Sequence, residues 1–227
     1  MRRNNRILWF RGHADERWKL VPALGRDRKL AIAEQNLIRR FKQNAVGLLD
    51  KPPDHEWNWM FLMQHHRLPT RLLDWSESPL VGLYFSVRDR KFKRRPGALW
   101  CLDPVKLNRG AEIDFENDFE IPAFGEKPLE NYEPSKIAME RASSLLPVAG
   151  LAARSNDRIY AQMGTFTVSH RKFFALESIP NSPTVKLIVP PAAKAQLCRE
   201  LDHLRVNDLT MFPELDSVSR LAAEDSR

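Results

Sequence analysis

The chain has 227 residues, of which 43% are hydrophobic and 29% are charged, and its formal net charge is +7. These shares lie near the averages of globular proteins, so the composition excludes a disordered, fibrous or collagen-like chain. No apolar run approaches the roughly 18 residues that a membrane helix needs, and the basic start leads into a strand-length segment rather than a signal-peptide core. We therefore expect a cytoplasmic protein with no membrane partner and with one domain over residues 1–227, its core at about 7–221.

The excess of basic residues fits an anionic partner, either nucleic acid or a phosphate-bearing small molecule. Residues 88–95 form a basic run and residues 112–120 an acidic one, so the two runs could instead pair with each other across a surface. Cys101 and Cys198 each lie in an apolar stretch, which favours buried free thiols over a disulfide or a zinc site.

The first expected element is a strand at residues 7–10, which are short and β-rich. Gly12 follows it and predicts a turn that presents Arg11 and His13. From residue 30 to residue 49, apolar side chains recur at steps of three and four, which predicts one long amphipathic helix. We expect that helix to serve as scaffold.

A second helix is expected after the stop at residues 52–54, and it carries Gln64 on the same face as Trp57 and other apolar side chains. A proline ends this helix, so residues 67–75 are predicted to form a polar loop. A third helix, begun by Pro79, continues to residue 87 and is apolar on every side, which indicates burial.

The rest of the chain mixes strand and helix signals, and we expect an α+β fold with a mixed sheet of short strands and surrounding helices. The stretch 104–160 shows no sustained periodicity and is assigned to loops and short helices. The remaining strands are expected at 98–102, 165–169 and 185–189, and the remaining helices around 197–204 and at 213–221.

The first candidate site is Arg11 with Gly12 and His13. An arginine at a strand end beside a glycine presents a permanently charged, forked donor where a phosphate or carboxylate can approach the backbone. The alternative is an arginine that binds a carboxylate of its own domain.

The second candidate site is residues 63–75, which crowd hydrogen-bond donors, acceptors and two imidazoles into one segment. Arg71 and Asp74 are three residues apart and could form an ion pair that fixes the loop. His65 and His66 are adjacent and point apart, so they cannot share a metal ion. Either histidine could act as a general base near neutral pH or could be a hydrogen-bonded structural residue.

A third candidate is residues 160–166, where Gly164 precedes a strand and allows the close approach of a ligand, with Gln162 as the polar contact. The sequence contains no dinucleotide-binding glycine motif, no phosphate-binding loop and no serine nucleophile elbow. Several large enzyme classes therefore lose their main sequence support.

These motifs together resemble the FRG domain, a family found chiefly in bacteria and their viruses and named for its Phe-Arg-Gly signature. The resemblance extends from Trp9 to Leu221 and implies the position of a site without implying a reaction. His66 and Arg67 depart from it, because such domains usually carry an aromatic residue and a glycine there. The matching motifs are Phe10-Arg-Gly-His13, Gln64-His65, Leu68-Pro-Thr-Arg-Leu-Leu-Asp-Trp75, Pro79-Leu-Val-Gly-Leu-Tyr-Phe85, Gln162-x-Gly-x-Phe166 and Phe212-Pro-Glu-Leu-Asp216.

A fainter similarity extends to ADP-ribosyltransferase-like folds, which place an arginine or histidine on their first core strand and an aromatic-small element like residues 83–86 on a later segment. It implies NAD as the cofactor, with Arg11 on the pyrophosphate or ribose and with Gln64 and Arg71 completing the anion contacts. Those enzymes usually keep a late glutamate, for which Gln162 is the nearest substitute here.

The resulting hypothesis is a pocket for an anionic, nucleotide-like ligand, in which Arg11 and Arg71 share one cavity. The alternatives are a nucleic-acid-binding module that uses the basic run 88–95, and a regulatory or interaction domain that keeps the pocket only as structure. Trp75 is expected mainly to pack the loop. The catalytic candidates are His13, His65, Asp74 and Gln162, and the ligand-binding candidates are Arg11, Gly12, Gln64, Thr70, Arg71, Trp75 and Tyr84.

Overall fold

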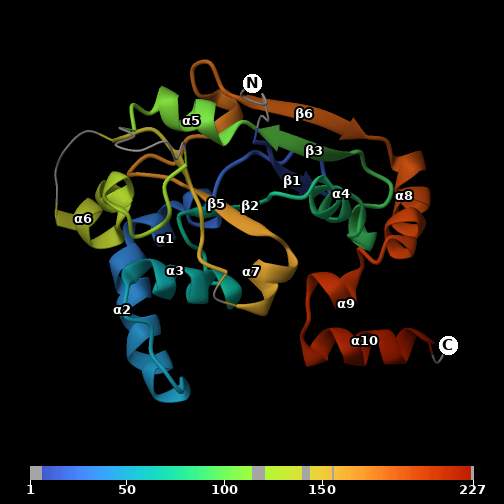
Figure 1. The fold of residues 1–227 in the computed structure, drawn as a ribbon, viewed down its shortest axis with the longest axis horizontal. Coiled ribbons are helices and arrows are strands. Elements are labelled where there is room, and N and C mark those ends of the chain that lie inside the picture. The colour runs from blue at the N-terminus through green and yellow to red at the C-terminus, as the bar shows by residue number, and fades with distance from the viewer. Residues whose placement is uncertain (1–6, 114–120, 140–143, 155, 226–227) are drawn as a thin grey trace, which may run out of the picture.

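The structure is a computed structural model that describes residues 7–113, 121–139, 144–154 and 156–225. It contains one six-stranded sheet in the order β4-β5-β2-β1-β3-β6, with helices around it (Figure 1). The strands are β1 (Trp9–His13), β2 (Leu72–Ser76), β3 (Gly97–Leu102), β4 (Val148–Gly150), β5 (Gly164–Val168) and β6 (Thr184–Val189). The α+β class is confirmed. Among the described residues every ladder of the sheet is antiparallel rather than mixed, because composition marks a strand without giving its direction.

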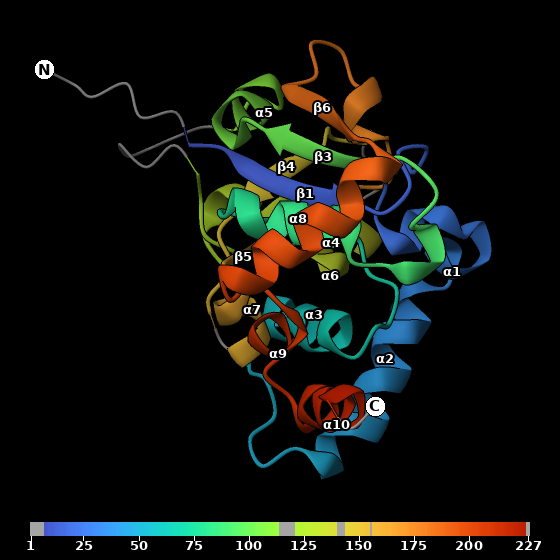
Figure 2. The same ribbon diagram turned by 90° about the vertical axis from the view of Figure 1, so that its right-hand side faces the viewer.

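The helices are α1 (Arg28–Ile32), α2 (Glu34–Ala45), α3 (Glu56–His65), α4 (Pro79–Val87), α5 (Pro104–Gly110), α6 (Pro134–Met139), α7 (Asp157–Ala161), α8 (Pro191–His203), α9 (Asp208–Met211) and α10 (Leu215–Asp225). Figure 2 shows α4 and α8 together over the sheet, with α9 and α10 leading away from it. In the described part of the chain, no helix combines the length and the apolar character that crossing a bilayer requires.

The central strand β1 and helix α4 make the closest packing of the fold. A Cβ atom at Gly12 would lie 2.0 Å from the backbone oxygen of Gly82, and one at Gly82 would lie 2.9 Å from the Cβ of Phe10. Both positions therefore need glycine because the two backbones approach too closely for any side chain. As its all-round apolar sequence predicts, α4 is largely buried.

The sheet separates two hydrophobic clusters, because side chains alternate between its faces. Trp9, Leu73 and Trp75 belong to one cluster, whereas Leu72 and Phe166 belong to the other, together with the buried face of α3. A fully buried side chain of this size contributes about 1.5–3 kcal/mol to folding. A third cluster joins α4 to α8 and α9.

Three sequence predictions fail in the first half of the chain. The strand expected at residues 7–10 with a turn at Gly12 is instead β1 (Trp9–His13), so Arg11, Gly12 and His13 lie within the strand. The stretch 67–75, predicted as a polar loop, contains β2, in which only Asp74 is exposed. Burial on both faces removes the alternation of apolar and polar residues by which a strand is recognised. The polar residues on either side of β2 therefore favoured a loop. The single helix predicted for 30–49 is two helices, α1 and α2, whose junction is at Ala33.

Other expectations have mixed outcomes. The helices α3, α8 and α10 and the strands β3, β5 and β6 lie within a few residues of the predicted positions, whereas the three-residue strand β4 lies in the stretch assigned to loops. Cys101 and Cys198 are free but only partly buried. The acidic run lies largely outside the described residues.

Candidate functional site

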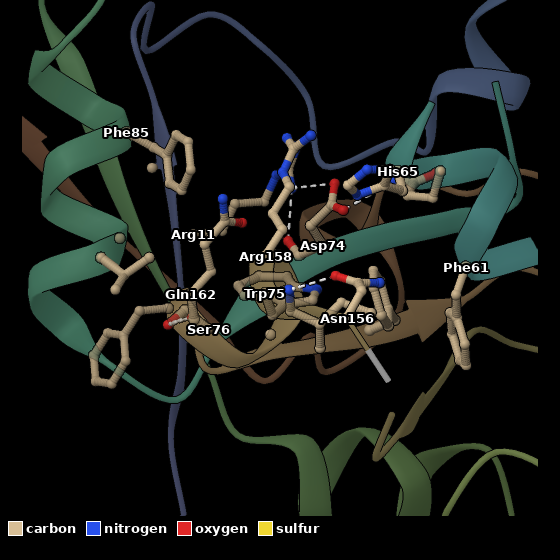
Figure 3. A pocket seen from close by; sticks show the side chains of 18 residues that line it. Arg11, Phe61, His65, Asp74, Trp75, Ser76, Phe85, Asn156, Arg158 and Gln162 are labelled. Atoms are coloured by element: carbon tan, nitrogen blue, oxygen red, sulfur yellow. Dashed lines mark hydrogen bonds and ion pairs between the residues drawn. The ribbon is translucent and has the colours of Figure 1, made fainter. Parts of the chain in front are cut away.

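A cavity with a volume of about 260 Å³ opens where β1 and β2 meet α3, α4 and α7 (Figure 3). Its walls are partly aromatic, since Phe61, Phe85 and Phe166 are among the residues that line it. Its polar side chains come from elements far apart in the sequence, and they include Arg11, Gln64, His65, Asp74, Arg158 and Gln162.

Arg11 on β1 and Asp74 on β2 lie at the centre of the polar side. The Nη1 of Arg11 donates to the backbone oxygen of Asp74 at 2.6 Å and lies 3.3 Å from its Oδ2. The Nε2 of Gln64 donates to the other carboxylate oxygen at 2.9 Å. The Asp74 side chain is still 52% exposed, so it retains acceptor capacity for a ligand.

His13 lies behind Arg11 and outside the cavity. Its Nε2 accepts a hydrogen bond from the Nε of Arg11 at 3.1 Å, and its Nδ1 lies 3.1 Å from the backbone oxygen of Trp18. The Nε1 of Trp100 also donates to this Nδ1 at 3.2 Å, so each of the ring nitrogens faces a donor and the ring is held in its neutral form. Burial and the adjacent Arg11 charge lower the pKa of His13 to about 3. His13 therefore orients Arg11 and is not among the residues that line the cavity.

Thr70 is likewise a support and does not line the cavity. Its hydroxyl donates to the Oε1 of Gln64 and accepts from the backbone N–H of Leu72 at 3.2 Å. Because the Gln64 oxygen is held by a donor, its amide nitrogen must point toward Asp74. Thr70 thereby fixes the direction of the amide.

Arg71 lies away from the cavity, on the other side of the chain. Its Nε donates to the Oε1 of Glu34 at 2.8 Å, its Nη2 pairs with the other oxygen, and its Nη1 donates to two backbone oxygens, of Ser169 and His170. The predictions that Arg71 pairs with Asp74 and shares a cavity with Arg11 are therefore wrong. In an extended segment, residues three apart point to opposite sides, so Arg71 and Asp74 cannot meet.

His65 lines the cavity from the last turn of α3, whereas its neighbour His66 is exposed. The Nδ1 of His65 is buried and has no hydrogen-bond partner among the described residues. Burial, followed by the proximity of His66, lowers the pKa of His65. Burial therefore favours the neutral form of the ring.

Gln162 and Ser76 form the side of the cavity nearest α9. Ser76 donates to the backbone oxygen of Gln162 at 2.7 Å, and the Nε2 of Gln162 donates to the backbone oxygen of Met211 at 2.9 Å. The amide oxygen of Gln162 has no partner in the described part of the chain. It is therefore free to accept a hydrogen bond.

The other predicted ligand contacts have different positions. Gly12 lines the cavity, and Trp75 does so with its Nε1 donating to Thr167 at 3.1 Å, consistent with a packing role. Tyr84 instead pairs with Asp208, which also binds Arg88 at 2.7 Å, in a neighbouring second cavity.

Arg158 and Asn156 were not predicted. Asn156 caps α7 by accepting from the N–H of Ile159 at 2.9 Å, and this places Arg158 at the cavity with its Cζ 4.7 Å from the centre of the Phe212 ring. Within the described residues Arg158 forms no ion pair with a carboxylate. The missed signal was the cap, an asparagine followed by an acidic residue at the start of a short helix.

The cavity thus offers two guanidinium groups, one carboxylate and one neutral imidazole. Over the described ranges, no group of three or more His, Cys, Asp or Glu side chains is placed to hold a metal ion.

A family model described as the FRG domain matches residues 6–95. No curated protein and no solved structure matches the chain. The matched range contains Arg11, Gln64, His65 and Asp74, whereas Arg158 and Gln162 lie beyond it. The resemblance is therefore confirmed over a shorter range than the sequence motifs indicate. The matched range supplies β1, α3, β2 and α4, so the similarity to the FRG domain family is limited to this first part of the chain.

Proposed function

We propose that the cavity binds an anionic, nucleotide-like small molecule. The observation that carries this proposal is the pair of guanidinium groups at one cavity. Arg158 forms no ion pair with a described carboxylate, and the Nη2 of Arg11 has no hydrogen-bond partner among the described residues. Arginine presents forked donors that match the geometry of phosphate oxygens.

The orientation of Arg11 favours recognition by the guanidinium group. His13 and Asp74 hold its Nε and Nη1, so binding a ligand through Nη2 costs little side-chain entropy. Burial lowers the pKa of Arg11, and the nearby Asp74 opposes that effect. An anion at Nη2 would compensate further for the burial of the charge.

The remaining groups suit the nucleoside part of such a ligand. Asp74 has free acceptor capacity for ribose hydroxyls, and the half-buried ring of Phe85 offers an apolar surface for a base. The amide oxygen of Gln162 and the ring of His65 add further polar contacts. A nucleotide would place its phosphate beside the two arginines and its base against the aromatic wall. Both the polar and the apolar side of the cavity would then contact the ligand.

A catalytic form of the same proposal uses NAD as a donor of ADP-ribose. In such a transfer, the bond between the ribose and nicotinamide breaks and a nucleophile takes its place on the ribose carbon. Asp74 would orient the ribose, and His65 would be the proton acceptor for the nucleophile. This form is supported by the single carboxylate that lies beside two guanidinium groups.

A thermal-shift experiment with AMP, ATP, NAD and inorganic phosphate tests the proposal. A ligand at about one hundred times its Kd should raise the unfolding free energy by about 2.7 kcal/mol. Arg158→Ala should weaken binding about tenfold or more, because a charge-assisted hydrogen bond contributes about 1.5–3 kcal/mol. Arg39→Ala, at an exposed position on α2, is the matched control and should not change binding.

The outcome that would end the proposal is the absence of a shift with any of these ligands. An equal loss of binding in Arg39→Ala would also count against it, since the effect would then follow overall charge. Release of nicotinamide from NAD by the wild type, absent in Asp74→Asn, tests the catalytic form separately.

A further inference from the structure

A second cavity, of about 580 Å³, adjoins the first, and both are lined by Gly12 and Phe85. Its other walls include Trp18, Phe212 and Arg90. The two cavities therefore meet at Gly12 and Phe85, and the second one extends to Arg88 and Arg90 at the start of the basic run 88–95. Apart from Phe85, none of the residues assigned to the proposed small ligand lines this second cavity.

The second cavity has an exposed aromatic ring at its edge. Trp18 is 41% exposed, and its ring meets Phe92 edge to face, with the centres 4.9 Å apart. Phe92 in turn has the guanidinium carbon of Arg95 at 5.7 Å from its ring centre. An exposed tryptophan ring held in one orientation by a neighbouring aromatic ring is a surface on which unpaired bases stack.

Positive charge continues beyond Trp18. Arg88 and Arg95 each pair with an aspartate, which leaves Lys91, Lys93 and Arg94 exposed and without an ion pair to any described residue. Three adjacent cations of this kind repel one another and favour a polyanion over a single phosphate.

The first cavity closes at its inner end. Phe61, Ile159 and Phe166, which line that end, are 3%, 8% and 4% exposed and belong to the hydrophobic core. Its volume of about 260 Å³ lies below the range of about 300–1,000 Å³ typical of ligand pockets. A ligand longer than one nucleotide must therefore continue into the second cavity.

We infer that the ligand is the end of a single-stranded nucleic acid. Its terminal nucleotide occupies the first cavity with a phosphate on Arg11 and Arg158, the next base stacks on Trp18, and later phosphates follow the cations at 91–94. This inference rests on the proposed function and narrows its substrate class from a free nucleotide to the end of a strand.

Titration calorimetry with AMP and an oligoadenylate of about six nucleotides tests the inference. The oligonucleotide should bind about tenfold more tightly than AMP at low salt, and its affinity should fall with a slope of about −2 in log–log salt plots for three phosphate contacts. AMP binding should depend less on salt.

Two variants separate the two cavities. The double variant Lys93→Glu/Arg94→Glu should lower the affinity for the oligonucleotide to the affinity for AMP. Its affinity for AMP should be unchanged. Trp18→Ala should weaken only the oligonucleotide, by about fivefold or more. The charge-matched control is Arg39→Glu/Arg40→Glu on α2, where both arginines are exposed. A circular oligoadenylate has no end to place in the cavity and should bind no more tightly than AMP.

Other outcomes overturn the inference. If AMP binds and the linear oligonucleotide binds no more tightly than AMP, the inference fails and the proposed function stands. Oligonucleotide binding that Arg158→Ala leaves intact, or that the circular form shares, also overturns it, because the end is then outside the first cavity. If neither AMP nor oligonucleotide binds, the inference fails, and the proposed function fails with it when ATP, NAD and inorganic phosphate also give no thermal shift.

Discussion

Arg11 and Arg71 belong to one short list of sequence candidates, yet their surroundings differ completely. Arg71 is 3% exposed and each of its nitrogens is used within the protein, whereas Arg11 has one nitrogen to spare at the cavity. The difference depends on Glu34, which lies at the start of α2 and 37 residues away. No pattern around Arg71 indicates that partner, so its role could not be predicted from the sequence.

Replacing Arg71 with methionine should lower the free energy of unfolding by about 3–5 kcal/mol, because Glu34 would keep a buried charge without its partner. The double variant Arg71→Met/Glu34→Leu should recover part of this loss. Urea denaturation of the single and double variants measures both effects. The folded fraction of each variant should bind ligand as tightly as wild type. A loss of affinity in the folded protein would contradict the position of Arg71 outside the cavity.

The candidate site was predictable only in part. Arg11, Gly12, Gln64, His65, Asp74, Trp75 and Gln162 do line one cavity. Thr70 and His13 support it from behind, a distinction that depends on which way each side chain points and not on its type. Arg158 was not predicted because it lies on a helix of five residues, in a stretch where the apolar residues show no periodicity.

At the scale of elements, the sequence predicted those whose burial is one-sided or whose ends carry strong signals. Helix α4 begins at Pro79, and α3 ends before a proline, so both were located correctly. Strand β2 was not predicted because a hydrophobic cluster covers it on each face of the sheet. All of its residues except Asp74 are therefore buried, and no alternation of apolar and polar residues remains. Strand pairing was not predictable either, since β1 lies beside β3, some 80 residues later.

The contact between β1 and α4 gives a direct test of the packing. Gly12→Ala should destabilise the protein by about 3 kcal/mol or more, because the new methyl group would lie 2.0 Å from the backbone oxygen of Gly82. Gly47→Ala is the matched control. No atom lies within 4 Å of a Cβ at Gly47, so this change should be neutral or stabilise by about 0.4–1 kcal/mol. Thermal unfolding of both variants measures the difference, and equal melting temperatures would refute the close approach.

At the scale of the whole molecule, the family match and the fold have different limits. The matched range 6–95 contains β1 and β2, but β1 pairs with β3 and β2 pairs with β5, both of which lie outside it. The same holds for the cavity, whose wall at α7 comes from the later chain. The sheet and the site are therefore completed by segments that the family match does not cover.

The pH dependence of stability is a property of the whole molecule that His13 should dominate. In the unfolded chain a histidine titrates near 6.5, whereas the pKa of His13 in the fold is about 3, owing to burial and then to the charges of Arg11, Arg26 and Lys186. Its contribution to stability is therefore complete above about pH 6.5 and is lost as the pH falls toward 3. The limiting slope is about 1.4 kcal/mol per pH unit.

His13→Gln provides the comparison, because glutamine keeps an acceptor for Arg11 without titrating. Urea denaturation between neutral and mildly acidic pH should show wild type losing stability faster than the variant, so that the gap between them narrows. His65 has a lowered pKa in both proteins and contributes equally to each. Parallel curves would mean that His13 is already protonated or exposed in the fold.

The close contact between Gly12 and Gly82 also affects how a ligand enters and leaves the first cavity. The β1–α4 side of the cavity has no slack, since its two backbones already touch. The opposite side, which carries Arg158, is tied to the C-terminal helices by one amide hydrogen bond from Gln162 and by the stacking of Phe212. Helix α9 is itself fixed to α4 by Asp208, which binds Tyr84 and Arg88. Passage into the cavity should therefore displace α7 while β1, α4 and α9 stay in place, and the movement of α7 should set the residence time of a bound molecule.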